Sequence, residues 1–338
     1  MLSQKISLQN KQVLICPLDW GLGHTARCVP LIKFLQEQKN VVTIACDPKQ
    51  KLFLELEIDD VKYVDLFGYD VRYSLSLPLW QKIFLQFPRL SAVVRKEHKW
   101  LADFLQKNKV DVVISDNRFG LYNKAVESVF ITHQVFVKAP FLSGFINYMN
   151  HTFIKRFNAC WVVDFEEKER SLAGGLSHGK FFFPHANFIG PLSRFEHKEP
   201  AGEKKHDVLI LLSGVEPQRE LLEKKLIEVF SGSTQFTIAL VRGTAVPPKT
   251  SYPKNFTVKN MVATRELEDL LLSSKNIICR SGYSSLMDLQ ALSLQALLIP
   301  TPGQTEQEYL AEYWNKKFGF KTLVQSQITK EAVLNLLS

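Results

Sequence analysis

The chain has 338 residues, of which 46% are hydrophobic and 22% are charged. This balance excludes extensive disorder and fibrous repeats, and at about 150 residues per domain the length predicts two domains. The 42 Lys and Arg residues against 34 Asp and Glu residues give a net charge of +8. Such an excess favours an acidic partner, which could be nucleic acid, an anionic lipid headgroup or a phosphorylated substrate.

The cysteines and the amino terminus indicate the compartment. Five cysteines are spread along the chain without a Cys-x-x-Cys pair, so we expect neither a disulfide framework nor a thiolate zinc site, and no metal or cofactor. The amino terminus has no apolar signal core, and no apolar stretch approaches the roughly 18 residues that a membrane span needs. We therefore expect a cytoplasmic protein, at most peripheral at the inner face of the cell membrane.

Short runs rich in Val and Ile alternate with segments of helical periodicity. Strands are predicted at Val13–Leu18, Val41–Cys46, Asp111–Asp116, Val129–Thr132, Cys160–Phe165, Asp207–Ser213, Phe236–Val241, Asn276–Arg280 and Gln295–Pro300. Helices are predicted where Ala26, Val29, Ile32 and Leu35 recur, at Pro217–Phe230 and at Arg265–Ser273. Strands that are apolar throughout are typical of parallel sheets covered by helices on both faces. The sequence therefore predicts an α/β fold.

This rhythm breaks once, between Gly190 and His206, where the chain is polar, charge-dense and contains Pro and Gly. Such a composition is typical of a linker between domains. We predict two Rossmann-like doubly wound domains facing a cleft, at residues 1–190 and 207–338, joined by a linker at 191–206. In such sheets ligands bind beyond the carboxyl ends of the strands, so function is expected in the strand-to-helix loops.

The first of these loops, residues 19–27, follows the first predicted strand. Gly21 and Gly23 allow a ligand to approach the backbone, and the following helix start presents N–H groups to an anion. His24 at this helix start is a candidate base, because the helix dipole favours the neutral imidazole; the alternative is a capping or core histidine. The spacing also matches a dinucleotide fingerprint with Asp47 as the ribose-binding acid, so an NAD-binding protein remains an alternative.

Two further loops follow successive strands of the second half. The first, Arg280–Ser285, combines small residues with a helix start and predicts an anion nest, with Asp288 one turn inside within reach of a ribose. The second places Gln304, Gln307 and Glu308 around another helix start, where amides and carboxylates suit sugar hydroxyls. The alternative is that these residues merely cap two ordinary helices.

Together with the Gly-x-Gly-His loop, these two clusters resemble the GT-B glycosyltransferases, and most closely the branch of the lipid II-forming N-acetylglucosaminyltransferase of peptidoglycan synthesis. The resemblance covers most of the chain and is strongest from Asn260 to Ala311. It implies a UDP-sugar donor such as UDP-N-acetylglucosamine in the carboxyl-terminal domain, an acceptor in the amino-terminal domain, and inversion without a required metal.

Positions matching the family's motifs carry the implied roles. Tyr283, Ser284 and Ser285 would hold the donor phosphates through backbone N–H groups, with Arg280 and Gly282 in the same turn. Asp288 stands at the ribose position, Gln307 and Glu308 at the sugar, and Val262 near the uracil. Ser213 and Gly214 replace a second glycine-rich loop beside the phosphates, and Arg194 takes the place of an inter-domain arginine. Trp20, Gly21 and Gly23 belong to the acceptor loop.

The sequence also departs from the lipid II enzyme. A His-Glu-Gln motif of the acceptor domain appears here as Thr132-His133-Gln134, and the amino-terminal loop contains Asp19 and Trp20 in place of small residues. These differences predict a relative with a different hydroxyl acceptor. A UDP-sugar epimerase or hydrolase of the same fold remains an alternative, whereas no nucleic-acid-binding module is recognisable.

The implied mechanism is displacement at the anomeric carbon, with His24 as the base for the acceptor hydroxyl. The nests and Arg194 would stabilise the leaving diphosphate, and Asp116 and His133 are candidate partners of His24 or of the acceptor. Two basic, aromatic-rich segments, Trp80–Lys109 and Phe141–Phe157, are candidate surfaces for an anionic membrane that carries a lipid-linked acceptor. The alternative is that their apolar residues face the core.

Overall fold

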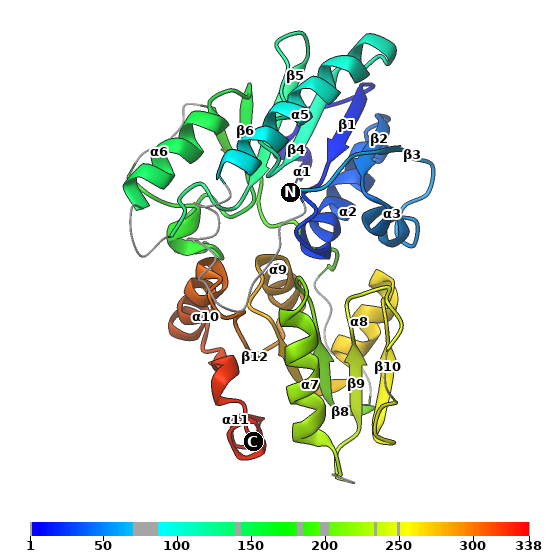
Figure 1. The fold of residues 1–338 in the computed structure, drawn as a ribbon, viewed down its shortest axis with the longest axis vertical. Coiled ribbons are helices and arrows are strands. Elements are labelled where there is room, and N and C mark those ends of the chain that lie inside the picture. The colour runs from blue at the N-terminus through cyan, green and yellow to red at the C-terminus, as the bar shows by residue number, and fades with distance from the viewer. Residues whose placement is uncertain are drawn as a thin grey trace. The chain divides into compact units, whose positions relative to one another are not determined.

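A computed structural model of the chain describes residues 2–69, 87–138, 143–180, 185–196, 203–232, 235–248 and 251–337. The chain divides into two compact units, with the boundary in sequence between Leu192 and Ser193; Trp20–Gly23 are grouped with the second unit. This boundary falls inside the predicted linker. Each unit is built around one parallel sheet (Figure 1).

The first unit contains a seven-stranded sheet in which every neighbouring pair is parallel. In spatial order its strands are β3 (Lys62–Asp65), β2 (Val41–Cys46), β1 (Gln12–Cys16), β4 (Val112–Asp116), β5 (Glu127–Thr132), β6 (Ala159–Val162) and β7 (Ala186–Phe188). Its helices are α1 (Leu2–Lys5), α2 (Leu22–Glu37), α3 (Pro48–Leu54), α5 (Phe87–Lys107) and α6 (Ser143–Ile154), with a 3-10 turn, η1, at Gly174–Leu176.

The second unit repeats this plan with six parallel strands. Their spatial order is β10 (Phe256–Lys259), β9 (Ile238–Val241), β8 (His206–Leu211), β11 (Ser274–Cys279), β12 (Leu297–Leu298) and β13 (Lys321–Thr322). The helices are α7 (Gln218–Phe230), α8 (Thr264–Leu272), α9 (Tyr283–Ala291), α10 (Thr305–Phe318) and α11 (Lys330–Leu337), with a 3-10 turn, η2, at Gln325–Gln327.

Both sheets share one topological feature that locates ligands. In each, the first strand lies between the second and the fourth, so the chain winds first in one direction and then in the other. The point of reversal lies between β1 and β4 in the first unit and between β8 and β11 in the second. Ligands of doubly wound sheets bind at the carboxyl ends of the strands at this point.

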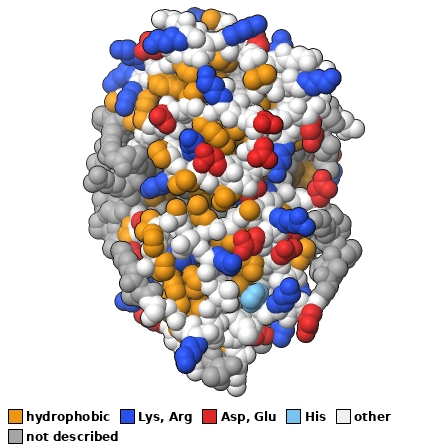
Figure 2. Space-filling model, turned by 90° about the vertical axis from the view of Figure 1, so that its right-hand side faces the viewer, with side chains coloured by type: hydrophobic (Ala, Val, Ile, Leu, Met, Phe, Trp, Pro, Cys, Tyr) orange, Lys and Arg blue, Asp and Glu red, His pale blue; other side chains and the backbone are white. Residues whose placement is uncertain are grey.

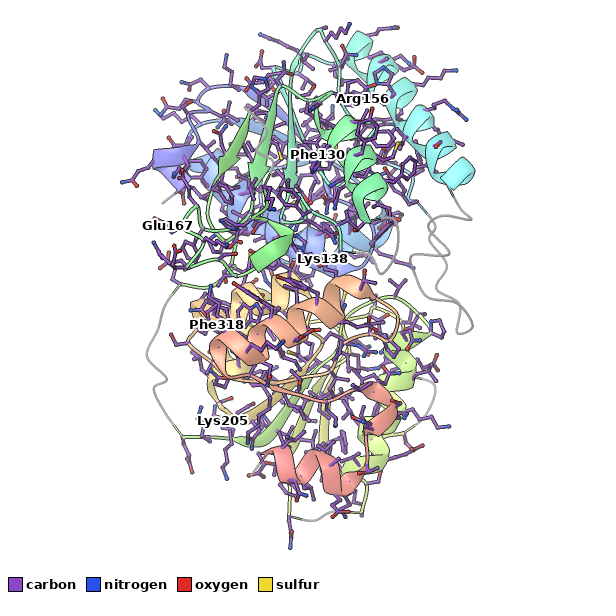
Figure 3. The ribbon with its side chains drawn as sticks, turned by 90° about the vertical axis from the view of Figure 1, so that its left-hand side faces the viewer. Phe130, Lys138, Arg156, Glu167, Lys205 and Phe318 are labelled. Atoms are coloured by element: carbon purple, nitrogen blue, oxygen red, sulfur yellow. The ribbon has the colours of Figure 1, made fainter. Side chains whose placement is uncertain are left out.

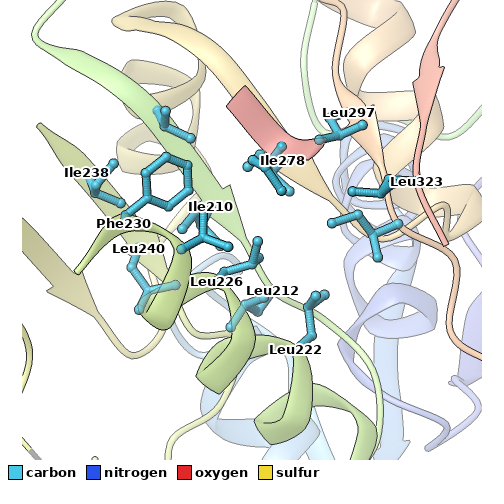
Figure 4. Packing of buried hydrophobic residues seen from close by; sticks show 14 residues of the cluster. Ile210, Leu212, Leu222, Leu226, Phe230, Ile238, Leu240, Ile278, Leu297 and Leu323 are labelled. Atoms are coloured by element: carbon cyan, nitrogen blue, oxygen red, sulfur yellow. The ribbon is translucent and has the colours of Figure 1, made fainter. Parts of the chain in front are cut away.

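The core of the second unit explains how α7 is fixed on its sheet. Leu222, Leu226 and Phe230 lie on one face of α7 and pack against Ile210 and Ile238 of the strands (Figure 4). The spacing of four residues places all three side chains on the same side of the helix. This buried face holds the loop before α7 at the carboxyl end of β8.

Aromatic side chains fill part of the first core. Phe130, labelled in Figure 3, lies 5.1 Å from Phe119 and 5.0 Å from Phe157 between ring centroids. In a second cluster of this core, Trp100 stacks on Phe104 at 5.2 Å and packs against the residues around Leu14. Residues 80–86 of the first candidate membrane segment lie outside the described residues, but for Trp100 the structure supports the alternative of core packing.

The α/β fold with two Rossmann-like sheets is confirmed, and every strand and helix predicted above corresponds to one in the structure. No helix in the described part of the chain is both long and apolar enough to cross a membrane. Figure 2 shows Lys and Arg side chains interspersed with Asp and Glu over one face, so the positive excess is not gathered into a single patch there.

Candidate functional site

In the first unit, the point of reversal between β1 and β4 carries an imidazole and a carboxylate. His24 lies in the first turn of α2, and Asp116 is the last residue of β4, a strand buried along its whole length. His24 Nδ1 lies 3.1 Å from Asp116 Oδ1. The histidine side chain is 17% exposed and the aspartate is fully buried, so only the imidazole reaches the surface of this unit. The structure thus brings together two residues that the sequence predicts as catalytic partners.

Arg27 completes this cluster, and sequence reasoning did not single it out. It lies one turn after His24 on the same helix and donates from Nε to Asp116 Oδ2 at 2.9 Å and from Nη2 to Asp116 Oδ1. Its Nη1 lies 2.9 Å from Nδ1 of His133, which follows β5. The signal was present in the spacing, because residues three apart share one helix face.

The charges around Asp116 keep it ionised. Burial alone would raise the pKa of this carboxyl group, but Arg27 and His24, through charge and hydrogen bonds, hold it below its usual range. The thiol of Cys28 donates to Asp116 Oδ2 at 3.6 Å, and burial holds the pKa of this thiol well above its ordinary value. Cys28 therefore remains protonated and is no nucleophile.

A second buried ion pair fixes the loops on either side of this cluster. Glu97 of α5 accepts from Arg118 Nε at 2.7 Å, from the Tyr69 hydroxyl at 2.9 Å and from the Gly120 amide at 2.9 Å. Asp19 accepts from the Tyr69 amide at 3.0 Å. The network therefore joins the loop that leads to His24 with the loop that follows Asp116.

The predicted acceptor residues lie in the chain between Asp19 and His24. Trp20 and Gly21 come directly after Asp19, and Gly23 lies in the first turn of α2. Gly21 has a φ of +92°, a left-handed backbone conformation that favours glycine, and it sets the direction in which the chain enters α2.

In the second unit, the point of reversal between β8 and β11 carries the predicted anion nests. Because β8 and β11 pair in parallel, the loops after them lie at the same edge of the sheet. Ser213 and Gly214 lie in the first of these loops, where Gly214 has a φ of +102°. Gly282 is the N-cap of α9, and as a glycine it has no side chain that could cap the helix start. The amides of Tyr283, Ser284 and Ser285 stand in the first turn, where helix geometry provides them no carbonyl partner of their own helix.

Arg280 supports this turn from behind. It is fully buried, and its guanidinium donates to the carbonyl groups of Ile299, Pro300 and Gln218 at 3.2, 3.1 and 2.8 Å. Among the described residues it has no carboxylate partner, and its Nε is buried without a hydrogen bond. Burial lowers the pKa of Arg280 to about 10, so the group is still charged at neutral pH. The Arg280 side chain thus joins the start of α7 to the loop after β12, and it places a positive charge near the start of α9.

Asp288 and Arg194, predicted to contact different parts of the donor, lie together. Asp288 Oδ2 accepts from Arg194 Nη2 at 2.9 Å, and Oδ1 accepts from Ser193 Oγ at 2.9 Å. The Arg194 amide also lies 3.3 Å from Oδ1. The aspartate is 7% exposed, so this first segment of the second unit is tied firmly to α9.

The last predicted donor residues surround the start of α10, whose N-cap is Gln304. Gln307 accepts from the Thr301 amide through Oε1 at 2.9 Å, and its carbonyl accepts from Ser281 Oγ at 2.8 Å. Glu308 accepts from the Gly303 amide at 2.8 Å. Gln307 therefore lies beside the Gly282 turn.

Val262 is the remaining predicted donor residue. It is 5% exposed and lies between β10 and α8. No group of three or more His, Cys, Asp or Glu side chains suited to a metal ion occurs among the residues that the structure describes.

Comparison with known families finds a match in the second unit. Residues 211–338 match the glycosyltransferase family 28 C-terminal domain. This match contains all the predicted donor residues except Arg194, and it confirms the prediction of a glycosyltransferase. A search of curated proteins finds no match to the sequence.

Solved structures share the fold of the whole chain. The glycosyltransferase of kitacinnamycin has 16% identity and a TM-score of 0.62, covering 98% of this chain and 92% of its own. The spinosyn rhamnosyltransferase has 14% identity and a TM-score of 0.64, with coverage of 96% and 91%. A UDP-glucosyltransferase from Polygonum tinctorium, capable of glucosylating indoxyl, has 15% identity and a TM-score of 0.63, with coverage of 98% and 90%. The chain therefore has the GT-B glycosyltransferase fold. None of these three is the lipid II-forming enzyme.

Proposed function

We propose that the protein transfers a hexose or N-acetylhexosamine, with inversion, from a UDP-sugar to a hydroxyl group of an acceptor. The observation that carries the proposal is the buried, positively charged Arg280, two residues before Gly282, the N-cap of α9, which supplies no side-chain cap. A buried charge without a counter-ion is costly, and an anion at the adjacent turn would offset that cost. The diphosphate of a nucleotide sugar is such an anion, and a helix start binds it through backbone N–H groups.

Donor binding then involves the four loops that follow β8, β10, β11 and β12 of the second unit. The amides of Tyr283, Ser284 and Ser285 and the loop at Ser213 and Gly214 hold the diphosphate, with Gly282 allowing its close approach. The segment at Val262 lies near the base, Asp288 with Arg194 near the ribose, and Gln304, Gln307 and Glu308 near the transferred sugar. The UDP-glucosyltransferase of the same fold supports UDP as the nucleotide.

The acceptor is activated in the first unit. The acceptor hydroxyl gives its proton to Nε2 of His24 while its oxygen forms a bond to the anomeric carbon. The bond from that carbon to the phosphate oxygen breaks at the same time, and its electron pair leaves with UDP. Asp116 orients the imidazole through Nδ1 and stabilises the imidazolium that forms, which is the usual role of a carboxylate behind a histidine base. Trp20, Gly21 and Gly23 contact the acceptor beside His24, and His133 completes the wall of this site.

Isothermal titration with UDP tests the donor site. We expect wild-type protein to bind UDP and Arg280→Met to bind it at least about tenfold more weakly, which corresponds to 1.4 kcal/mol. Arg170→Met is the control, because Arg170 is 56% exposed and contacts its neighbours Glu167 and Phe165 in the first unit. Absence of UDP binding to the wild type would refute the proposal.

A screen of UDP-sugars and other nucleotide sugars, read by nucleotide release, tests the reaction itself. Release that depends on an added hydroxyl acceptor supports the transferase, whereas release or rearrangement without an acceptor favours an epimerase or hydrolase. His24→Ala is expected to retain UDP affinity and to lose turnover by about 10²–10⁴-fold. Unchanged turnover would remove His24 from the mechanism.

We propose further that the acceptor is lipid-linked and reached at an anionic membrane surface. Phe145 and Tyr148 of α6 are 56% and 68% exposed, and exposed Lys155 and Arg156 follow the helix. Arg156, labelled in Figure 3, lies with its guanidinium 4.7 Å from the centre of the Phe153 ring. Exposed aromatic and basic side chains together are typical of peripheral membrane contact. Flotation with anionic vesicles that is unchanged by Phe145→Ser with Tyr148→Ser would exclude α6 as the contact.

A further inference from the structure

The cluster around Arg27 contains more than a histidine and an aspartate. Arg27 is 2% exposed, and its guanidinium donates to both oxygens of Asp116 while its Nη1 lies 2.9 Å from Nδ1 of His133. His133 is itself 3% exposed. One buried guanidinium thus connects α2, the end of β4 and the segment after β5.

The donors and acceptors in this cluster determine where the ring protons lie. A guanidinium has only donors, so Nδ1 of His133 must be the acceptor, and the ring proton of His133 is on Nε2. Ionised Asp116 has only acceptors, so Nδ1 of His24 must be the donor, and Nε2 of His24 carries the lone pair. The two imidazoles therefore have opposite tautomers, assigned here from the hydrogen-bond network.

The charged groups of this cluster lie close to His24. Arg27 and Cys28 from α2 contact Asp116, and His133 from the segment after β5 contacts Arg27. With Arg27 and Asp116 both charged, the cluster is neutral while His24 is neutral. If Arg27 were uncharged, Asp116 would instead favour a protonated His24, which cannot accept a proton from an acceptor.

We infer that Arg27 is a positioning residue that holds His24 and His133 in opposite tautomers and keeps Nε2 of His24 available as the base. The inference rests on the proposed function for the use of that base, but the tautomers themselves do not depend on it. Arg27 contacts no substrate in this scheme. It acts on the reaction through Asp116 and the two imidazoles.

Nitrogen NMR of the wild-type protein tests the tautomers without a variant. Protein labelled with ¹⁵N-histidine is recorded by long-range ¹H–¹⁵N correlation, and the signals are assigned with His24→Gln and His133→Gln. We expect the proton on Nδ1 in His24 and on Nε2 in His133. A proton on Nδ1 of His133, or on Nε2 of His24 in the neutral ring, would overturn the inference.

Arg27→Met tests the part that Arg27 plays. We expect His133 to populate both tautomers in this variant, and the acidic limb of the pH–turnover profile to move to higher pH, because a positive charge near His24 has been removed. Arg118→Met is the matched control for the NMR signals, because it also removes a buried guanidinium but one that bonds no histidine. Unchanged tautomers in Arg27→Met, or a fall in turnover by the same factor at every pH, would overturn the inference.

The two proposals fail in different ways. If no UDP-sugar is turned over while the wild-type tautomers are as expected, the proposed transfer reaction is refuted and the assignment of Arg27 to the tautomers is supported. If UDP-sugar is turned over while His133 carries its proton on Nδ1, the reaction is supported and the role of Arg27 is refuted.

Discussion

Replacing Glu97 with Gln removes one negative charge from the interior of the first unit and changes little else. The carboxylate is fully buried and accepts three hydrogen bonds, from Arg118, from the Tyr69 hydroxyl and from the Gly120 amide. Glutamine has the same length but only one acceptor oxygen, and its NH₂ group must face one of these three donors. We expect Glu97→Gln to destabilise the first unit.

The structure sets the size of this effect. Arg118 is also fully buried, so the substitution leaves a guanidinium in the core with only the more distant carboxylate of Asp19, 3.9 Å away. Breaking such a pair from one side costs about 3–5 kcal/mol. Burial raises the pKa of Glu97, although Arg118 and the hydrogen bonds from Tyr69 and Gly120 oppose this, so part of the attraction already offsets desolvation. We therefore expect a loss near the lower end of this range, about 3 kcal/mol.

Amide hydrogen exchange measures this loss within one unit, which matters because two units need not unfold together. The free energy of opening is read at the amides of β4, the strand that leads to Arg118. Glu55→Gln is the matched control, because Glu55 is 46% exposed and lies 3.7 Å from Lys51, and such helix pairs contribute about 0.3–0.5 kcal/mol. A loss below about 1 kcal/mol in Glu97→Gln would show that the buried pair does not hold these loops.

Three further outcomes follow from other parts of the structure. Leu226→Ala, in the contact between α7 and its sheet, should destabilise the second unit by about 2–5 kcal/mol, measured by the same exchange method. Asp207, whose pKa is lowered to about 2 by hydrogen bonds from Lys275 and Thr237, stabilises the fold above its unfolded pKa of about 4, and this contribution is lost as the pH falls towards 2. In Asp207→Asn the urea midpoint should therefore change less between pH 4 and pH 2 than in the wild type. The difference should correspond to no more than the roughly 1 kcal/mol of a surface pair. Arg280→Lys keeps the charge but not the fork of donors, so UDP affinity should lie between those of wild type and Arg280→Met in calorimetry.

The central strands could be predicted from the sequence, and the edge strands could not. Runs such as Val112–Asp116 are buried on both faces, which leaves a continuous apolar signal. The strands at the edges of the two sheets, β3 and β10, are half-buried or exposed along their length, and β7 and β13 have three and two residues. The hydrophobic pattern of such short, polar segments is the same as that of a loop. They become strands only because they pair with a neighbouring strand of the sheet.

The loops of the candidate site could be located from the sequence, whereas most of their side-chain partners could not. Strand ends and glycines mark the positions of His24, Asp116 and Gly282 along the chain. The pairing of Arg194 with Asp288 depends on how the first segment of the second unit returns to α9, which no local pattern records. The burial of Arg27 could not be predicted either. The helix was predicted from its apolar residues, and a single charged residue among them is usually exposed.

Three arginines are among the largest fully buried side chains described, and their counter-charges separate their roles. Arg27 has Asp116 and Arg118 has Glu97, so each is balanced within the first unit before any ligand arrives. Burial lowers the pKa of Arg118, but the attraction of Glu97 together with that of Tyr69 and Asp19 outweighs burial and raises it, whereas burial alone acts on Arg280 and lowers its pKa to about 10. Hydrogen bonds to three carbonyl groups reach both terminal nitrogens of Arg280 but not Nε, and they do not neutralise its charge. Two of these guanidiniums can therefore set the geometry of loops without attracting a ligand. The third retains a charge that favours an anion at the turn it supports, and for this reason Arg280, rather than Arg27 or Arg118, carries the argument for a diphosphate donor.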